Sequence, residues 1–173
     1  MEKHISRIKT CLVIGTGGAA KAAIYAILKK IIPDELYVLG RSFEKAEFLK
    51  LKYKDTNSKT KVYNENLNKI NTYLGKVDLI VNATSLGMHP NINESIYPEN
   101  IELKNNSIVY DLIYNPLETK LLKQVRANNT ECIAINGLPM LVAQAVKSVE
   151  IWTGKSISIK NTINALDISI LTP

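Results

Sequence analysis

The chain has 173 residues, of which 46% are hydrophobic and 22% charged, and its 22 basic and 16 acidic side chains give a formal net charge of +6. This length predicts one domain, or one domain with a short appendage, and the composition excludes a disordered, collagen-like or coiled-coil protein. No stretch reaches the roughly 18 apolar residues that a membrane span needs, and the amino terminus lacks the apolar core of a signal peptide.

The cysteines and the charge indicate the setting and the kind of partner. Cys11 and Cys132 each lie inside an apolar run, so we expect free thiols and a cytoplasmic location. The positive charge favours an anionic partner, but the lysines are scattered outside residues 50–61, and no aromatic side chains alternate with them to stack on bases. We therefore expect a phosphorylated small molecule rather than a nucleic acid, and no membrane or metal partner.

Apolar runs and helical patterns alternate along the chain in a regular order. Strands are predicted at residues 10–14, 36–39, 61–63, 77–83, 107–112 and 131–135. Helices are predicted between and after them, at residues 19–31, 42–53, 67–74, 119–128 and 138–152. Because continuous apolar strands that alternate with helices are typical of a parallel sheet covered on both faces, we predict an α/β fold. The expected sheet is doubly wound and has about six parallel strands in the order 3-2-1-4-5-6.

Two segments do not follow this alternation. Residues 85–106 form a long predicted loop with two prolines, and such length inside a compact domain indicates a functional loop. The sequence after Gly154 is polar with scattered isoleucines. We therefore place the domain at residues 8–155 and leave residues 156–173 as an unassigned polar tail.

Residues 15–20 follow the pattern G-x-G-x-x-A, directly after a predicted strand and directly before a predicted helix. In Rossmann-like folds the first glycine permits a tight turn, the second lets a pyrophosphate approach the backbone, and the small last position allows close packing of helix on sheet. Free N–H groups and the helix dipole favour phosphates there. The alternative is a turn that serves only packing. The candidate cofactor-binding residues of this turn are Gly15, Thr16, Gly17, Gly18 and Ala19.

The end of the second predicted strand indicates which dinucleotide is favoured. Enzymes that use NAD place Asp or Glu there, whereas Gly40, Arg41 and Ser42 include no acid. The Arg41 guanidinium suits a phosphate, and Lys45 lies one helical turn further on the same face. This pattern favours NADP, whose 2′-phosphate needs a cation. The alternative is a solvated helix start.

Polar side chains also follow the fourth and fifth predicted strands. Asn82, Thr84 and Ser85 are further candidate cofactor-binding residues, because they lie at the carboxyl end of the fourth strand, across from the glycine turn, where open α/β sheets bind ligands. The alternative is a turn that ends the strand. Tyr114 follows the fifth strand at the same edge and is placed to meet a polyhydroxylated substrate, or else packs beside Pro116.

Gln144 is the lone polar side chain in residues 140–146. If it is buried it needs a partner, and a substrate hydroxyl would serve. The alternative is a solvated helix face shared with Lys147.

Five motifs in this order resemble those of the carboxy-terminal, NADP-binding domain of shikimate dehydrogenases. They read GTGGA at 15–19, GRS at 40–42, NATSLGM at 82–88, DLIYNP at 111–116 and GLPMLVAQA at 137–145. The resemblance covers roughly residues 8–155. It implies an NADP-dependent oxidoreductase of aromatic amino acid biosynthesis, which reversibly reduces 3-dehydroshikimate to shikimate.

The resemblance also implies roles for single residues. Leu112 and Gly137 would contact NADP together with residues 15–19 and 40–45, and Tyr114 and Gln144 would contact shikimate. Gly40 departs from the usual Asn of the family, and Ser42 replaces Thr but keeps the hydroxyl.

The catalytic Lys–Asp pair of the family lies in an amino-terminal substrate domain, and the motif Asn-x-Thr-x-Pro-x-Lys occurs nowhere in this sequence. We therefore expect no catalytic residue in this chain and no activity without a substrate domain. His4 and His89 are assigned no catalytic role. The alternative is a free-standing NADP(H)-binding module that regulates without catalysis.

Overall fold

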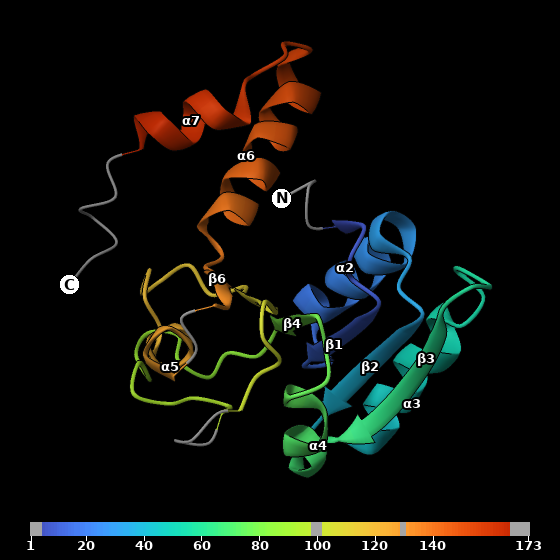
Figure 1. Cartoon of the computed structure of the whole chain (residues 1–173). Coiled ribbons are helices and arrows are strands. Elements are labelled where there is room, and N and C mark those ends of the chain that lie inside the picture. Colours follow the sequence, from blue (N-terminus) through green and yellow to red (C-terminus); the bar gives the residue numbers. More distant parts are fainter. Residues whose placement is uncertain (1–4, 98–101, 129–130, 167–173) are drawn as a thin grey trace.

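The computed structural model describes residues 5–97, 102–128 and 131–166. A six-stranded parallel sheet in the order β3-β2-β1-β4-β5-β6 forms its centre (Figure 1). The strands are β1 (Thr10–Ile14), β2 (Glu35–Gly40), β3 (Lys61–Asn66), β4 (Leu79–Asn82), β5 (Ile108–Asp111) and β6 (Ile133–Ile135). The predicted fold class, number of strands and strand order are confirmed.

The helices occupy the predicted segments, with one addition. They are α2 (Gly18–Ala26), α3 (Phe43–Tyr53), α4 (Ile70–Leu74), α5 (Lys120–Asn128), α6 (Leu138–Thr153) and α7 (Ile159–Ala165). A π-helical turn (Ile27–Ile31) continues α2, and a 3-10 turn (Leu67–Lys69) precedes α4. The addition is α7, which packs against α6 within the segment that the sequence pattern leaves unassigned. None of its residues is buried, so no apolar stripe marks it in the sequence.

The core has two halves, one on each face of the sheet. Strand residues alternate between the faces because successive side chains of a strand point in opposite directions. On the face covered by α2 and α3, the core includes Cys11, Val13, Ile24, Leu28, Leu36, Val38, Ala46 and Leu49. On the face covered by α4 and α5, it includes Leu12, Ile14, Leu39, Ile70, Leu74, Ile80, Val109, Leu121 and Val125.

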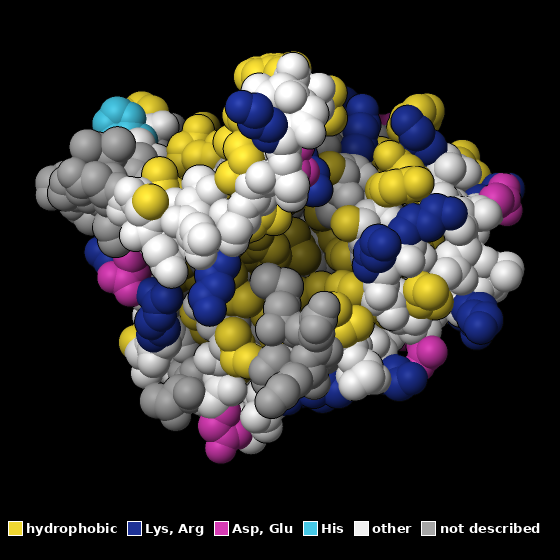
Figure 2. Space-filling model, turned by 90° about the horizontal axis from the view of Figure 1, so that it is seen from above, with side chains coloured by type: hydrophobic (Ala, Val, Ile, Leu, Met, Phe, Trp, Pro, Cys, Tyr) yellow, Lys and Arg dark blue, Asp and Glu magenta, His cyan; other side chains and the backbone are white. Residues whose placement is uncertain are grey.

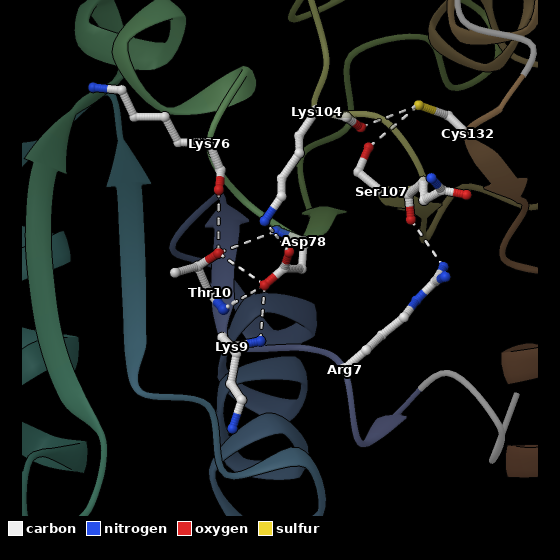
Figure 3. A network of polar contacts seen from close by, with 9 residues as sticks. Arg7, Lys9, Thr10, Lys76, Asp78, Lys104, Ser107 and Cys132 are labelled. Atoms are coloured by element: carbon white, nitrogen blue, oxygen red, sulfur yellow. Dashed lines mark hydrogen bonds and ion pairs between the residues drawn. The ribbon is translucent and has the colours of Figure 1, made fainter.

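The amino ends of β1 and β4 are joined by a polar network around Asp78 (Figure 3). The Asp78 carboxylate accepts hydrogen bonds from the backbone N–H groups of Lys9 at 2.8 Å and Thr10 at 2.9 Å, and from Thr10 Oγ1 at 3.1 Å. Lys104 Nζ forms an ion pair with it at 2.5 Å. Burial acts to raise the pKa of Asp78, but the hydrogen bonds from Lys104, Lys9 and Thr10 outweigh it and lower the pKa. The network thereby ties together three segments that are far apart in the sequence.

Among the described helices, none is both long enough and apolar enough to cross a bilayer.

Candidate functional site

A groove of about 420 Å³ lies at the carboxyl ends of β1, β2 and β4. Its lining contains nine of the residues predicted to bind a cofactor, namely Gly15, Thr16, Gly17, Gly40, Arg41, Ser42, Lys45, Thr84 and Ser85. The structure therefore brings together three motifs that are separated by up to some seventy positions in the sequence. We call this space the carboxyl-end groove.

The lining also contains residues that were not predicted from the sequence, namely Ile14, Leu39, Leu67, Ala83 and Leu86. Ala83 and Leu86 lie inside the NATSLGM motif, so the motif was the available signal for them. Leu67 follows β3 in a polar stretch and belongs to no motif. Its place in the groove follows from the strand order, which sets β3 beside β2.

The glycine turn is held between two neighbouring strands. Gly15 has a φ of +120°, and a Cβ there would lie 2.6 Å from the carbonyl oxygen of Ala83, so only glycine fits. Its N–H donates to the carbonyl of Leu39 at 2.8 Å. At Gly17 and Gly18 an added Cβ would meet nothing within 4 Å. The outer side of the turn is thus open, which lets a bulky anion approach the backbone.

The start of α2 leaves its first N–H groups available to such an anion. Gly17 is the N-cap residue and provides no side-chain hydrogen bond, and the first turn contains no acidic residue. Gly18 is the first residue of the helix. The first N–H groups of a helix lack partners within the helix and carry the positive end of its dipole. The geometry therefore fits a phosphate group at this point.

Two cations flank the end of β2. Arg41 and Lys45 are exposed, and within the described residues neither side-chain charge forms an ion pair or hydrogen bond. Ser42 caps α3, since its Oγ accepts from the Lys45 N–H at 3.3 Å and donates to Glu44 Oε2 at 2.7 Å. This hydrogen bond from Ser42 lowers the pKa of Glu44. The Ser42 hydroxyl is thus engaged in the cap, while the two cations are free to meet an anionic ligand.

Gly40, at the end of β2, lies close to the side chain of Thr16 in the glycine turn. A Cβ at Gly40 would lie 2.7 Å from Thr16 Cγ2. A side chain at position 40 would therefore require the Thr16 side chain to shift.

Asn82 is fully buried and lies below the groove rather than in its lining. Its Oδ1 accepts from the Thr84 N–H at 3.0 Å and from Thr84 Oγ1 at 2.8 Å. Its Nδ2 donates to Asp111 Oδ1 at 3.0 Å. Asn82 thus orients Thr84, which does line the groove.

Asp111 is the buried anchor of this arrangement. Besides Asn82, its carboxylate accepts from Thr119 Oγ1 at 2.6 Å and from the Ile113 N–H at 3.2 Å. Burial raises the pKa of Asp111, against the lowering effect of these hydrogen bonds. Asp111 is the first residue of the DLIYNP motif, but the motif does not indicate which donors the Asp111 carboxylate accepts from.

The backbone after β5 lies in direct contact with the backbone at the start of α6. A Cβ at Gly137 would overlap the carbonyl of Leu112, and the Gly137 N–H donates to the carbonyl of Ile113 at 2.9 Å. Leu112 and Gly137 are thus brought together, but neither lines the carboxyl-end groove. Leu112 lines a second, apolar space instead, together with Ala19 and Gln144.

The two residues expected to contact a substrate lie outside the carboxyl-end groove. Tyr114 is 39% exposed on the loop after β5. Gln144 is exposed on α6, so burial does not force a partner on it. His89 is exposed, and His4 lies outside the described residues. In the part of the chain that the structure describes, no three His, Cys, Asp or Glu side chains are grouped to hold a metal ion.

A parallel sheet in this strand order, with a glycine turn and a helix start at its carboxyl edge, defines a Rossmann-like α/β domain. Residues 2–129 match the family model of shikimate/quinate 5-dehydrogenases, and residues 137–166 match that of the shikimate 5′-dehydrogenase C-terminal domain. The chain belongs to the shikimate/quinate 5-dehydrogenase family.

Individual relatives agree with this assignment. The chain is 38% identical to the shikimate dehydrogenase (NADP(+)) of Methanococcus aeolicus, with 99% of the chain and 58% of the relative covered. A solved shikimate dehydrogenase in complex with NADP+ superposes with a TM-score of 0.81 at 35% identity, covering 99% of this chain and 58% of that one. The quinate dehydrogenase of Corynebacterium glutamicum in complex with NAD gives 0.82 at 26% identity, covering 96% and 59%. The chain thus spans little more than half the length of these relatives.

Proposed function

We propose that this chain is the NADP(H)-binding domain of a shikimate dehydrogenase, which carries the cofactor for the reversible reduction of 3-dehydroshikimate to shikimate. The observation that carries the proposal is the carboxyl-end groove, which sets the open glycine turn opposite two unpaired cations. The relatives named above that act with NADP+ support it.

The residues of the groove fit an NADP-type dinucleotide. The pyrophosphate would lie over Gly17 and Gly18, where no side chain blocks the N–H groups of the α2 start. Arg41 and Lys45 would hold the 2′-phosphate, which an NAD site with an acid at this position would repel. Leu67 and Leu86 line the same groove and offer apolar surface to a flat base.

The bound cofactor would supply the hydride. The hydroxyl proton of shikimate must leave as the carbonyl forms, and a positioned acid or base has to take it. The described lining of the groove includes no carboxylate and no imidazole, and its cations lie on the side proposed for the phosphate. Asp111 is buried and already accepts three hydrogen bonds. We therefore assign proton transfer to a substrate domain and cofactor positioning to this chain.

The free thiols support a cytoplasmic location for this function. Cys11 is buried and Cys132 half-buried, and neither forms a disulfide. Burial also raises the pKa of the Cys11 thiol, which keeps it protonated and unreactive.

The test is NADPH formation from shikimate and NADP+ by the purified chain, followed by absorbance. We expect background turnover, because the groove of this chain supplies neither a group that positions the substrate nor a general acid or base. General acid–base catalysis alone contributes about 10²–10⁴ in rate. Addition of a substrate domain from a relative should restore turnover.

Robust turnover by the chain alone would contradict the proposal, and Lys21 and His89 would be the first residues to substitute. NADPH binding that never leads to turnover, with any substrate domain supplied, would instead favour a free-standing regulatory module.

A further inference from the structure

The strand β3 lies at one edge of the sheet and leaves that edge open. It pairs with β2 in a continuous parallel register from Lys61 to Asn66, and among the described residues no further strand pairs with it. Figure 1 shows no helix or strand beyond it. The strand contains neither a proline nor a bulge, devices that commonly shield an open edge. Because an unshielded edge strand is a template for pairing with another chain, the β3 edge is a candidate interaction surface.

This edge is distinct from the apolar space that Leu112 lines. That space appears in Figure 2 as a hollow with hydrophobic walls. Its lining includes Leu79 and Val81 of β4 and Ile108 and Tyr110 of β5. In the sheet, β1 and β2 separate these strands from β3. A partner at the β3 edge would therefore not fill the apolar space.

The backbone groups of Val62 and Asn64 face the open edge. The Lys61 N–H donates to the carbonyl of Asp34 at 2.9 Å, toward the β2 side. Because the backbone groups of successive strand residues point to alternate edges, those of Val62 and Asn64 point outward. In an antiparallel pair, residues that exchange hydrogen bonds stand opposite one another. A two-fold pair through this edge must therefore be centred on Val62, Tyr63 or Asn64, and not between two residues.

Side chains on one face of β3 select one of these centres. Lys61, Tyr63 and Glu65 point to the same face, because they are two positions apart. With Tyr63 at the two-fold axis, Lys61 of each copy stands opposite Glu65 of the other. The other two centres place an uncharged residue opposite Lys61. Within β3, only the Tyr63 centre pairs opposite charges, and it is self-complementary, as a two-fold interface requires.

The two charges are available for such a pair. Lys61 is exposed, and within the described residues its ammonium forms no ion pair. Glu65 Oε2 pairs with Lys69 Nζ at 2.8 Å in the same chain, and this contact lowers the pKa of Glu65. Glu65 is therefore ionised at neutral pH. Since an ionised carboxylate can accept several hydrogen bonds, Glu65 can also accept from the ammonium of a second copy.

Aromatic side chains on the same face form a row that ends at the open edge. Tyr37 on β2 packs against Tyr73 on α4, with ring centroids 4.4 Å apart. Tyr37 also stacks on Tyr63, with centroids 5.1 Å apart and an interplanar angle of 18°. Tyr63 is only half-buried and lies on the outermost strand. The Tyr63 of a second copy would continue the row and bury the exposed part of this ring.

We propose that the β3 edge pairs two copies of this chain in an antiparallel, two-fold dimer centred on Tyr63. The backbone of Val62 in each copy pairs with that of Asn64 in the other, and the Lys61 side chain pairs with Glu65. Because the two strands run in opposite directions, the two carboxyl-end grooves face opposite ways. The pair occupies the open edge of both copies, so the assembly closes at two chains.

The test is the mass of the whole chain in solution, measured by sedimentation velocity at low salt over a range of concentrations. We expect the wild-type chain to form a dimer. Lys61→Glu and Glu65→Lys each set like charges opposite one another, and each should weaken the dimer about tenfold or more. Mixing the two variants restores opposite charges at both positions, so the mixture should dimerise again. Lys123→Glu makes the same charge change at an exposed position of α5 and should leave the dimer intact.

A disulfide tests the register of the pair. Residues opposite one another in a non-hydrogen-bonded antiparallel pair have Cα atoms about 4.5 Å apart, which is within the span of a disulfide. In oxidised glutathione, Tyr63→Cys should therefore form a covalent dimer. Lys61→Cys should not, because position 61 faces Glu65 of the other copy. The wild-type chain, with Cys11 and Cys132, is the reference.

A wild-type chain that stays monomeric at every concentration would overturn the proposal. A dimer that persists in both charge variants, or a mixture of the two that stays monomeric, would overturn it as well. The register would be wrong if Lys61→Cys formed the covalent dimer and Tyr63→Cys did not. Assemblies that keep growing with concentration would contradict a pair that closes at two chains.

Discussion

The two ends of the sheet each contain an aspartate that joins strands, and the two aspartates differ in what surrounds them. Asp78, at the amino end, pairs with Lys104 and accepts from the start of β1, and these contacts lower its pKa. Asp111, at the carboxyl end, is fully buried, accepts from three uncharged donors, and has a pKa raised by burial. At the amino end, the partners of Asp78 are all groups of this chain. At the carboxyl end, Asp111 holds Asn82, which orients Thr84 in the lining of a groove that also contains two unpaired cations.

This difference separates polar groups that serve stability from those that serve binding. At the amino end, the Asp78 carboxylate and its donors satisfy one another within the described residues. At the carboxyl end, the buried Asn82–Asp111 pair is satisfied, but the cations above it, Arg41 and Lys45, are not. Substitutions at the two ends should therefore have different consequences for cofactor binding.

The largest effect is expected at Asp111. Asp111→Ala leaves three donors without an acceptor inside the protein and should lower the free energy of unfolding by about 4 kcal/mol, at about 1–3 kcal/mol for each buried group left unpaired. It should also weaken NADPH binding, because Asn82 no longer holds Thr84 in place. Urea denaturation and a fluorescence titration measure the two effects. Asp111→Asn is the control, since it keeps an acceptor oxygen, and an equal loss in both variants would contradict this account.

A smaller loss of stability is expected at Asp78. Asp78→Ala removes the acceptor of two backbone N–H groups and the partner of Lys104, which should lower the free energy of unfolding by about 2 kcal/mol. Because the amino end does not contact the carboxyl-end groove, the folded variant should bind NADPH within about twofold of the wild type. A large loss of NADPH affinity in a variant that stays folded would show that the two ends are coupled.

The smallest effect is a difference in pH dependence. The lowered pKa of Asp78 contributes stability that is present above its unfolded value of 3.8 and is lost as the pH falls through the folded value. The raised pKa of Asp111 has the opposite sign: its contribution is present below 3.8 and is lost as the pH rises through the folded value. Between about pH 4 and pH 7, Asp111→Asn should therefore gain stability relative to the wild type. Asp78→Asn should lose stability relative to the wild type as the pH rises toward about 4, and above that pH the difference should stay constant because the contribution of Asp78 is fully present. Urea midpoints measured below and above about pH 4 test both signs, and parallel curves for the two variants would contradict them.

The sequence predicted the fold because the apolar strands and their spacing are local properties. It also predicted most of the carboxyl-end groove, since Gly15, Arg41 and Thr84 sit in motifs that end neighbouring strands. It did not predict Leu67, because that residue reaches the groove only through the pairing of β2 with β3. Side-chain partners such as those of Asp111 depend on packing between distant segments, which no local pattern encodes.

The same reason explains why α7 was not predicted from the sequence. A short helix without buried residues leaves no apolar stripe in the sequence. The degree of burial at the end strands of the sheet also depends on packing between distant segments. Tyr110 and Ile135 lie in apolar strand sequences, which predict burial, but both are only half-buried in the structure.

The most direct test of the central claim is a titration of the purified chain with NADPH and with NADH, repeated with Arg41→Ala. We predict that NADPH binds at least about tenfold more tightly than NADH, because a charge-assisted hydrogen bond to the 2′-phosphate contributes about 1.5–3 kcal/mol. Arg41→Ala should remove most of this preference and leave the affinity for NADH nearly unchanged. Equal affinity for both cofactors in the wild-type chain, or an equal loss for both in Arg41→Ala, would contradict the account.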